Sequence, residues 1–260
     1  MSNYGIVGFG RIGRRLAARL PGAFTVLVRP AQSDDAAALL GPDRVCTTLD
    51  AFLARKPDIA IECASPRTLA DIGAVLLQAG IDLVPLSLTA IADPEVESRL
   101  MAAAEAGPGR LEIAPGAIGT LDLLATAREE GLKRVVYRQL KSPAMWRLTP
   151  AARLADLESI RERHVFFKGS VRDVARHLPN SLNTSVGVAL AGLGLDGTEA
   201  ELVADPALRE TGHELEIHAA PGNAVLQLGG RDVPPDGDPV DYTTFSLLRL
   251  LRRRQARVVI

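Results

Sequence analysis

Three glycines near the start of the chain have the spacing of a dinucleotide-binding loop, Gly8-x-Gly10-x-x-Gly13. In such a loop the first glycine permits a tight turn off a strand and the second lets the backbone approach a pyrophosphate. The third lets the next helix pack against the strand. Backbone N–H groups at the start of that helix attract phosphate. We therefore predict that the loop, with Arg11 and Ile12 inside it, binds NAD or NADP; the alternative is a turn that binds nothing.

The residue after the second predicted strand bears on the choice between NAD and NADP. An acidic residue there usually binds the adenosine 2′-hydroxyl of NAD, but this chain has Arg29. A cation suits the 2′-phosphate of NADP, and Arg11 is placed to assist it. Two alternatives stay open: Arg29 faces solvent, or Asp34 and Asp35 restore binding of NAD.

A further cofactor contact is predicted at Ala64, directly after the fourth apolar segment. In an open parallel sheet the cofactor lies across the carboxyl ends of the strands, so residues that follow a strand matter most. The small side chain of Ala64 would let a nicotinamide ribose come close. A plain tight turn is the other interpretation.

Histidine is the natural base for an enzyme that moves both hydride and protons, because it titrates near neutrality. The chain has four: His164, His177, His213 and His218. His213 and His218 are five residues apart on one predicted strand, so they face opposite sides of its sheet. His213 shares its side with apolar residues, and from the residues alone it is either a half-buried structural histidine or a base. Asn180 and Asn183 open a predicted helix, either as caps or as amides presented to a nicotinamide or a carboxylate.

The first part of the chain predicts a Rossmann-type, doubly wound parallel sheet, because apolar strands alternate with helices. Expected strands are 4–7, 24–28, 43–47, 58–63, 81–86 and 111–114, and helices follow the glycine loop and cover 66–79 and 95–106. We expect a dinucleotide-binding domain over residues 1–116, with a C-terminal helix in 240–260 packing back on it.

Residues 117–239 are predicted to form a second, α+β domain that carries substrate and catalysis. Its sheet is expected to be antiparallel. Expected helices are 117–130, 170–176 and 182–191, and expected strands are 134–140, which looks exposed, 200–203, 213–217 and 224–228. Residues 233–239 have the composition of a linker. Arginines 249 and 252–254 form either a solvated helix face or a phosphate patch.

The composition excludes several classes of protein. A formal net charge of −1 gives no reason to expect a nucleic-acid partner. Two cysteines make no disulfide framework, and no metal site is expected. No apolar run is long enough to cross a bilayer and no leader precedes the first strand. We expect a cytoplasmic protein without a membrane partner.

Nearly the whole chain, from Gly5 to about Leu251, resembles the L-aspartate dehydrogenase family. The matching stretches are the glycine loop, Ile61–Ser65, Ser87–Ala90 before Asp93, Ala114–Gly119, Lys141–Pro143 with Trp146, Lys168–Ser170, Pro179–Asn183, Ala204–Pro206 and His213-Glu214. The most specific are Gly116-Ala-Ile-Gly119 and His213-Glu214, in this order and spacing. Two stretches depart from the usual family pattern: Ser87-Leu-Thr-Ala90 and Ser181-Leu-Asn-Thr-Ser185.

The resemblance implies an NAD(P)-dependent enzyme that converts L-aspartate to iminoaspartate, then oxaloacetate and ammonia, or runs the reverse amination. It implies that His213 is catalytic and that Ala117 and Asn183 contact the cofactor. A dicarboxylate needs cations or oriented N–H groups, for which Lys141 and Asn180 are candidates, although Lys141 fits equally as a surface lysine. A homodimer and a role in pyridine nucleotide biosynthesis are expected as well.

Two other functions fit the same architecture. One is a different dehydrogenase, of the homoserine-dehydrogenase-like or dihydrodipicolinate-reductase-like type. The other is a cofactor-binding sensor that has the fold without the chemistry, because fold alone does not fix function.

Overall fold

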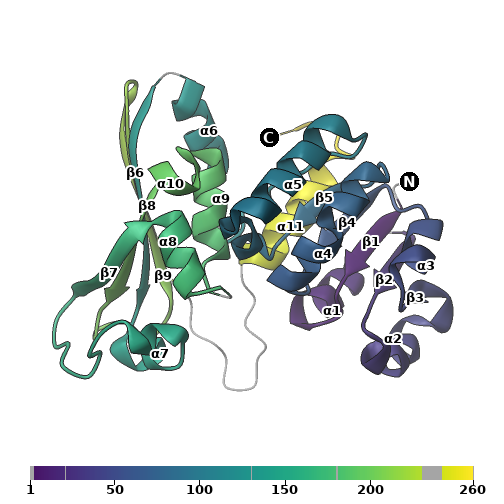
Figure 1. Cartoon of the computed structure of the whole chain (residues 1–260), viewed down its shortest axis with the longest axis horizontal. Helices are drawn as coiled ribbons and strands as arrows, with labels where there is room; N and C mark the ends of the chain where they lie inside the picture. The colour runs from purple at the N-terminus through teal and green to yellow at the C-terminus, as the bar shows by residue number, and fades with distance from the viewer. Residues whose placement is uncertain (1–2, 21, 130, 180, 230–241, 260) are drawn as a thin grey trace. The chain divides into compact units, whose positions relative to one another are not determined.

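The computed structural model describes residues 3–20, 22–129, 131–179, 181–229 and 242–259 (Figure 1). The chain divides into two compact units. Unit 1 consists of Met1–Gly116 with Thr243–Ile260, and unit 2 of Ala117–Tyr242. The expected linker at 233–239 and the candidate residue Asn180 lie outside the described residues.

Unit 1 contains a parallel five-stranded sheet, which confirms the predicted Rossmann-type architecture. The strand order is β3 (Val45–Cys46), β2 (Phe24–Leu27), β1 (Tyr4–Val7), β4 (Ile59–Glu62), β5 (Asp82–Pro85). The helices are α1 (Arg11–Ala17), α2 (Ser33–Leu40), α3 (Leu49–Ala54), α4 (Pro66–Gln78) and α5 (Pro94–Ala106). The order reverses between β1 and β4, and such a switch point is where ligands bind in open α/β sheets.

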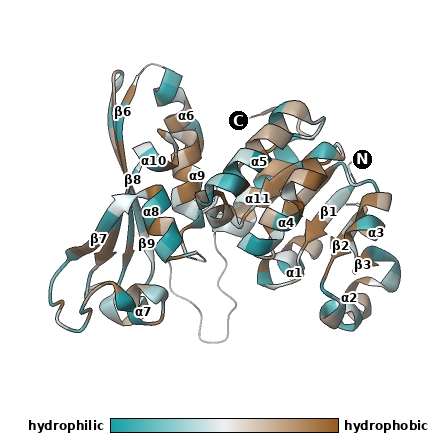
Figure 2. Cartoon of the chain, viewed as in Figure 1, coloured by the Kyte–Doolittle hydropathy of each residue, from teal (hydrophilic) through white to brown (hydrophobic). Residues whose placement is uncertain are grey.

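The strands of this sheet are mostly apolar, and most of their residues are buried. Every residue of β1 and β4 is buried, and Figure 2 shows hydrophobic colour gathered on the strands, whereas the helices carry both colours. Parallel strands buried on both faces read as continuous apolar runs, which explains why the sequence predicts them well.

Of the strands expected in unit 1, one is absent from the structure and another is shorter than expected. Residues 111–114 form no strand, because only Leu111 pairs, through a single bridge to Leu83. The segment 43–47 begins as a 3-10 turn, Pro42–Arg44, and only Val45 and Cys46 join the sheet. Helices α2 and α3 were not expected from the sequence.

The C-terminal helix α11 (Tyr242–Arg253) completes the core of unit 1. Its buried leucines are Leu247, Leu248, Leu250 and Leu251, which pack with Tyr4, Ile6 and Val26 of the sheet. Beyond the helix, Arg254 pairs with Asp82 and Glu112. Gln255 Nε2 donates to Tyr4 Oη at 2.6 Å. Arg254 therefore ties the chain to unit 1 by ion pairs, and is not part of a solvated face.

Unit 2 is built on a mixed five-stranded sheet with strand order β10 (Gly222–Leu228), β9 (Gly212–Ala219), β6 (Leu132–Lys141), β8 (Glu199–Ala204), β7 (His164–Ser170). The expectation of a purely antiparallel sheet is wrong at one pair, because β6 and β8 run parallel. A parallel pair needs a long crossover, and here it contains β7 and, among other helices, α8 (Val171–His177), α9 (Asn183–Ala191) and α10 (Gly194–Gly197).

The strand β6 lies in the centre of this sheet, so the expectation that it is exposed is also wrong. Val135, Val136 and Tyr137 are buried. Helix α6 (Leu121–Glu129) contacts α9 and β6, and the short helix α7 (Pro143–Arg147) follows β6 directly. The central position matters for function, because β6 and its neighbour β9 carry the candidate catalytic side chains.

No helix among the described residues is both long enough and apolar enough to cross a membrane.

Candidate active site

In the glycine loop of unit 1, two of the three glycines have no room for a side chain, and the third has open space beside it. Gly8 has a φ of +100°, and a Cβ there would lie 2.8 Å from the Cβ of Ala64. A Cβ on Gly13 would lie 2.2 Å from the Gly8 carbonyl oxygen. At Gly10 a Cβ would meet nothing within 4 Å. Only glycine therefore fits the first and third positions, and the second leaves the backbone accessible, as a pyrophosphate requires.

The other predicted residues of the loop lie at the start of α1. Arg11 is its first residue and is exposed, whereas Ile12 is half-buried against the core of unit 1. Ala64 follows β4 and, by its approach to Gly8, lies beside the loop. The structure thus brings Ala64 to the glycines, as the parallel order of β1 and β4 requires.

Arg29 follows β2 and is exposed, and its Nε lies 3.4 Å from Gln32 Oε1. Asp34 and Asp35 lie in the first turn of α2, also exposed. The positive end of the helix dipole stabilises carboxylates in the first turn. These two residues therefore have a structural role apart from the cofactor. Arg29 remains the charged side chain nearest in sequence to the end of β2.

Sequence analysis missed Glu62, a fully buried carboxylate at the end of β4. The backbone N–H groups of Ala64 and Ser65 donate to its Oε1 at 2.8 and 3.0 Å. The Ser87 hydroxyl donates to the same oxygen at 2.9 Å, and the Ser87 N–H to Oε2 at 3.1 Å. Glu62 therefore holds together the loops that follow β4 and β5. A lone carboxylate at the end of the apolar run 59–62 was the signal that could have found it.

Burial disfavours the charged forms of the two ionisable side chains at the end of β4, Glu62 and Cys63. Burial raises the pKa of Glu62, against the four hydrogen bonds, which lower it. Burial, with the neighbouring Glu62 charge, also raises the pKa of the Cys63 thiol. Cys63 is therefore a protonated packing residue without the thiolate that nucleophilic chemistry needs.

In unit 2 the sheet register gathers several polar side chains on one face. Gln139 of β6 lies directly opposite His213 of β9. Because side chains alternate along a strand, Tyr137 and Lys141 project to the same face as Gln139. Tyr137 Oη lies 2.7 Å from His213 Nδ1. We call Tyr137, Gln139, Lys141 and His213 the histidine cluster.

The electrostatics of the histidine cluster keep His213 neutral. Burial, and next the positive charge of Lys141, lower the pKa of His213 to about 4. Burial also lowers the pKa of Lys141. The Lys141 ammonium lies 4.8 Å from the centre of the Trp146 ring, and no carboxylate among the described residues pairs with it. His213 can therefore accept a proton, and Lys141 can receive an anion.

The start of α9 adjoins the histidine cluster. Asn183, predicted to contact cofactor, is the first residue of α9 and is half-buried. Leu182 is the N-cap, so the alternative of Asn183 as a helix cap is wrong. Burial raises the pKa of the Tyr137 phenol, and the side chain of the next residue, Thr184, lowers it in part. Ala117 lies half-buried in the same unit, in the segment before α6.

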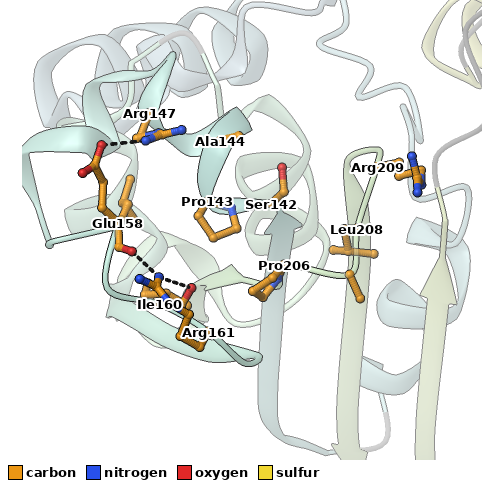
Figure 3. A pocket seen from close by; sticks show the side chains of 12 residues that line it. Ser142, Pro143, Ala144, Arg147, Glu158, Ile160, Arg161, Pro206, Leu208 and Arg209 are labelled. Carbon is orange, nitrogen blue, oxygen red and sulfur yellow. Dashed lines mark hydrogen bonds and ion pairs between the residues drawn. The ribbon is translucent and has the colours of Figure 1, made fainter.

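A cavity of about 760 Å³ opens in unit 2 beside α7 (Figure 3). Its lining includes Arg147, Arg161 and Arg209, and Arg147 is already paired with Glu158 at 2.7 Å. Neither His213 nor Lys141 lines it, although Ser142, the residue after Lys141, does. The cavity is therefore not the centre of the candidate site. The described residues also contain no group of three or more His, Cys, Asp or Glu that could hold a metal.

Comparisons with known proteins agree with both units. The family model "Homoserine dehydrogenase, NAD binding domain" matches residues 8–114. The family model "Aspartate dehydrogenase, C-terminal" matches residues 122–254, which include α11.

Curated relatives match over almost the full length. The L-aspartate dehydrogenase of Serratia proteamaculans is 34% identical over 95% of both chains. That of Cupriavidus taiwanensis is 36% identical over 100% of both chains. Among solved structures, aspartate dehydrogenase from Thermotoga maritima has a TM-score of 0.80 at 22% identity, covering 100% of this chain and 99% of that one.

Proposed function

The chain belongs to the L-aspartate dehydrogenase family, and we propose from that premise that it oxidises L-aspartate to iminoaspartate with NAD or NADP, or runs the reverse amination. The observation that carries the proposal is the pair of His213 and Lys141 on one face of the sheet. His213 is neutral, and Lys141 is a cation that pairs with no carboxylate in the described part of the chain. A base and an anion-binding cation are what the oxidation of an anionic amino acid needs.

The glycine loop fits a dinucleotide, as the open approach at Gly10 indicates. We assign cofactor contacts to Gly8, Gly10, Arg11, Ile12, Gly13 and Ala64 in unit 1, and to Ala117 and Asn183 in unit 2. When bound, the nicotinamide supplies the redox chemistry by accepting or returning a hydride. The protein positions the reactants and excludes water around them.

His213 is proposed as the base. In the oxidative direction it takes a proton from the substrate ammonium, while the Cα–H bond breaks and its electron pair leaves as hydride. The nitrogen lone pair then forms the C=N bond of iminoaspartate. Addition of water, with a second proton transfer, releases ammonia and oxaloacetate. A pKa near 4 means that His213 starts in the form that accepts protons.

Lys141 is proposed to bind a substrate carboxylate. Its ammonium is half-buried and depresses the pKa of His213. A carboxylate bound to Lys141 would offset that charge, so the basicity of His213 would increase when substrate is present. Asn180 remains a second candidate for substrate binding, and it lies outside the described residues.

Finer features belong to the same proposal. Arg29 supports the use of NADP, since its exposed guanidinium follows β2. Exposed apolar side chains of unit 2, such as Val225 and Val165 on its edge strands, support a homodimer, which light scattering tests. A location in the cytoplasm and a supply of iminoaspartate to pyridine nucleotide biosynthesis complete the proposal.

Initial-rate kinetics test the function. Purified protein is assayed with L-aspartate and each cofactor, and in reverse with oxaloacetate and ammonia; homoserine serves as the competing substrate. We expect aspartate-dependent reduction of at least one cofactor and little activity with homoserine. Cofactor binding by fluorescence without turnover of any amino acid would instead indicate a sensor, and preference for homoserine a different dehydrogenase.

A further inference from the structure

We propose that Glu62 is a positioning residue that builds the nicotinamide half of the cofactor site, because its buried carboxylate holds the turn after β4 and the loop after β5 together. The inference rests on the proposed binding of a dinucleotide by the glycine loop. It concerns which residues of unit 1 serve the nicotinamide end of the cofactor and leave the adenosine end unaffected.

The order of the strands assigns the two ends of the dinucleotide. In a doubly wound sheet a dinucleotide lies across the switch point, with one half over the strands on each side. The glycine loop follows β1, which has β2 and β3 on one side and β4 and β5 on the other. Arg29, the candidate for the adenosine 2′-phosphate, follows β2. The nicotinamide half therefore belongs to the carboxyl ends of β4 and β5.

Glu62 joins these two strand ends. It is the last residue of β4 and pairs with Pro85, the last residue of β5. Its Oε1 accepts from the N–H groups of Ala64 and Ser65 at 2.8 and 3.0 Å. The Ser87 hydroxyl donates to the same oxygen at 2.9 Å, and the Ser87 N–H donates to Oε2 at 3.1 Å. One side chain thus satisfies backbone donors of both loops, which are costly to leave unpaired where they are buried.

The carboxylate itself is out of reach of a ligand. Glu62 is fully buried, whereas Ala64, whose N–H it holds, is exposed. A Cβ on Gly8 would lie 2.8 Å from the Cβ of Ala64, so the turn that Glu62 holds also borders the glycine loop. Glu62 therefore acts through the residues that it positions, without touching the cofactor.

The glycine loop has its own attachments to the rest of unit 1. The Gly8 N–H donates to the Leu27 carbonyl at 2.9 Å, and the Arg14 N–H donates to the Gly10 carbonyl at 3.0 Å. These bonds join the loop to β2 and to α1. A change at Glu62 should therefore disturb the nicotinamide end of the site and leave the pyrophosphate and adenosine in place.

The test uses Glu62→Gln, Ser87→Ala and the double variant in the full-length protein. A glutamine amide has one acceptor oxygen, so its NH₂ group would face an N–H donor of one of the two loops. Glu62→Gln therefore breaks the connection between the loops with little change in size. Ser87→Ala removes the hydroxyl bond to Glu62 and keeps the backbone N–H bond.

Binding without substrate gives the readout. The Kd values of NADH and NADPH are measured by fluorescence, and those of ADP-ribose and 2′-phospho-ADP-ribose, which lack the nicotinamide, by calorimetry. Glu62→Gln should raise the Kd of the whole cofactor about tenfold, the value of a hydrogen bond to a charged group. The Kd of the matching fragment should not change. Ser87→Ala should raise the Kd of the whole cofactor about threefold, and the double variant by less than the product of the two factors, because both changes break one network.

Asp82→Asn is the matched control. Asp82 is the first residue of β5, at the opposite edge of the same sheet. Its Oδ1 accepts from the Arg110 N–H at 2.8 Å, and it pairs with Arg254. The loss of this carboxylate should lower the free energy of unfolding and leave the ratio of the two Kd values as it is in the parent protein.

Two results would overturn the inference. One is an equal rise in the Kd of cofactor and fragment in Glu62→Gln, which indicates a general effect on unit 1. The other is an unchanged Kd for the cofactor in both single variants. If Glu62→Gln does not fold, Ser87→Ala decides alone by the same comparison of cofactor and fragment.

Failure of the proposed function is a different outcome. It is recognised by a parent protein that binds the cofactor and does not oxidise aspartate, and the Kd comparison is made without aspartate. A parent protein that binds neither cofactor nor fragment would overturn the assignment of the glycine loop and this inference together.

Discussion

The two units differ in how far apart in sequence their functional residues lie. In unit 1 the cofactor loop is one short segment, Gly8 to Gly13. Its tight turn and its accessible backbone depend largely on glycines, which have no side chain. In unit 2 the histidine cluster joins β6 and β9, whose paired residues are more than 70 positions apart in the sequence. A backbone loop binds a part common to all dinucleotides, whereas a side-chain cluster can be specific for one substrate. The comparison predicts that changes in unit 2 affect turnover and changes in unit 1 affect cofactor binding or stability.

The largest effect is expected for His213→Gln. Removal of a general base should lower kcat by about 10²–10⁴-fold, while the Kd for the cofactor, measured by fluorescence, stays the same. His218→Gln is the matched control, because His218 lies on the opposite face of β9 and bonds Glu216 at 2.6 Å. Equal losses in both variants would break the assignment of the base.

Leu247→Ala tests whether α11 belongs energetically to unit 1. Leu247 is fully buried among residues of the parallel sheet, and truncation of such a leucine costs about 3 kcal/mol. The free energy of unfolding from urea titration should fall by this amount. Phe245→Ala, at a residue of the same helix that is 45% exposed, should cost much less.

Lys141→Met should raise the KM for aspartate by about tenfold or more, the value of a hydrogen bond to a charged group. The variant also removes a charge that depresses the pKa of His213, so that pKa should rise. Because the base must be unprotonated, the acid limb of kcat/KM should move to higher pH. Lys168→Met, on the edge strand β7, is the control and should alter neither value.

The smallest effect is expected for Arg29→Ala. Loss of an exposed guanidinium should raise the KM for NADP by about fivefold, within the range of a solvated charge contact. The KM for NAD should change little. Arg55→Ala, also exposed in unit 1, is the control; equal effects on NAD and NADP would remove Arg29 from the choice of cofactor.

The parts of the fold that the sequence predicts are those set by local patterns. The glycine loop, β4 and α4 are contiguous segments with apolar periodicity and clear ends, such as Pro66 at the start of α4. The edge strand β7 was not predicted, because its residues are mostly half-exposed and lack a buried face. The parallel pairing of β6 with β8 depends on a crossover that no local pattern encodes.

The candidate site was predictable to a similar extent. His213 and Lys141 stand out as residue types that move protons and bind anions. The contact of His213 with Tyr137 depends on the strand register that sets Gln139 opposite His213, and a one-residue shift would separate them. Glu62 was missed because its partners, such as Ser87, come from another strand end.

The position of α11 in the core of unit 1 has a consequence for synthesis of the protein. The ribosome makes the sheet of unit 1 first, then the whole of unit 2, and only then the leucines that cover the sheet. During synthesis, the apolar surface of unit 1 that α11 covers in the finished protein therefore stays exposed until unit 2 has been made. Nascent chains of this protein are exposed to chaperones and aggregation for longer than the size of unit 1 alone would suggest.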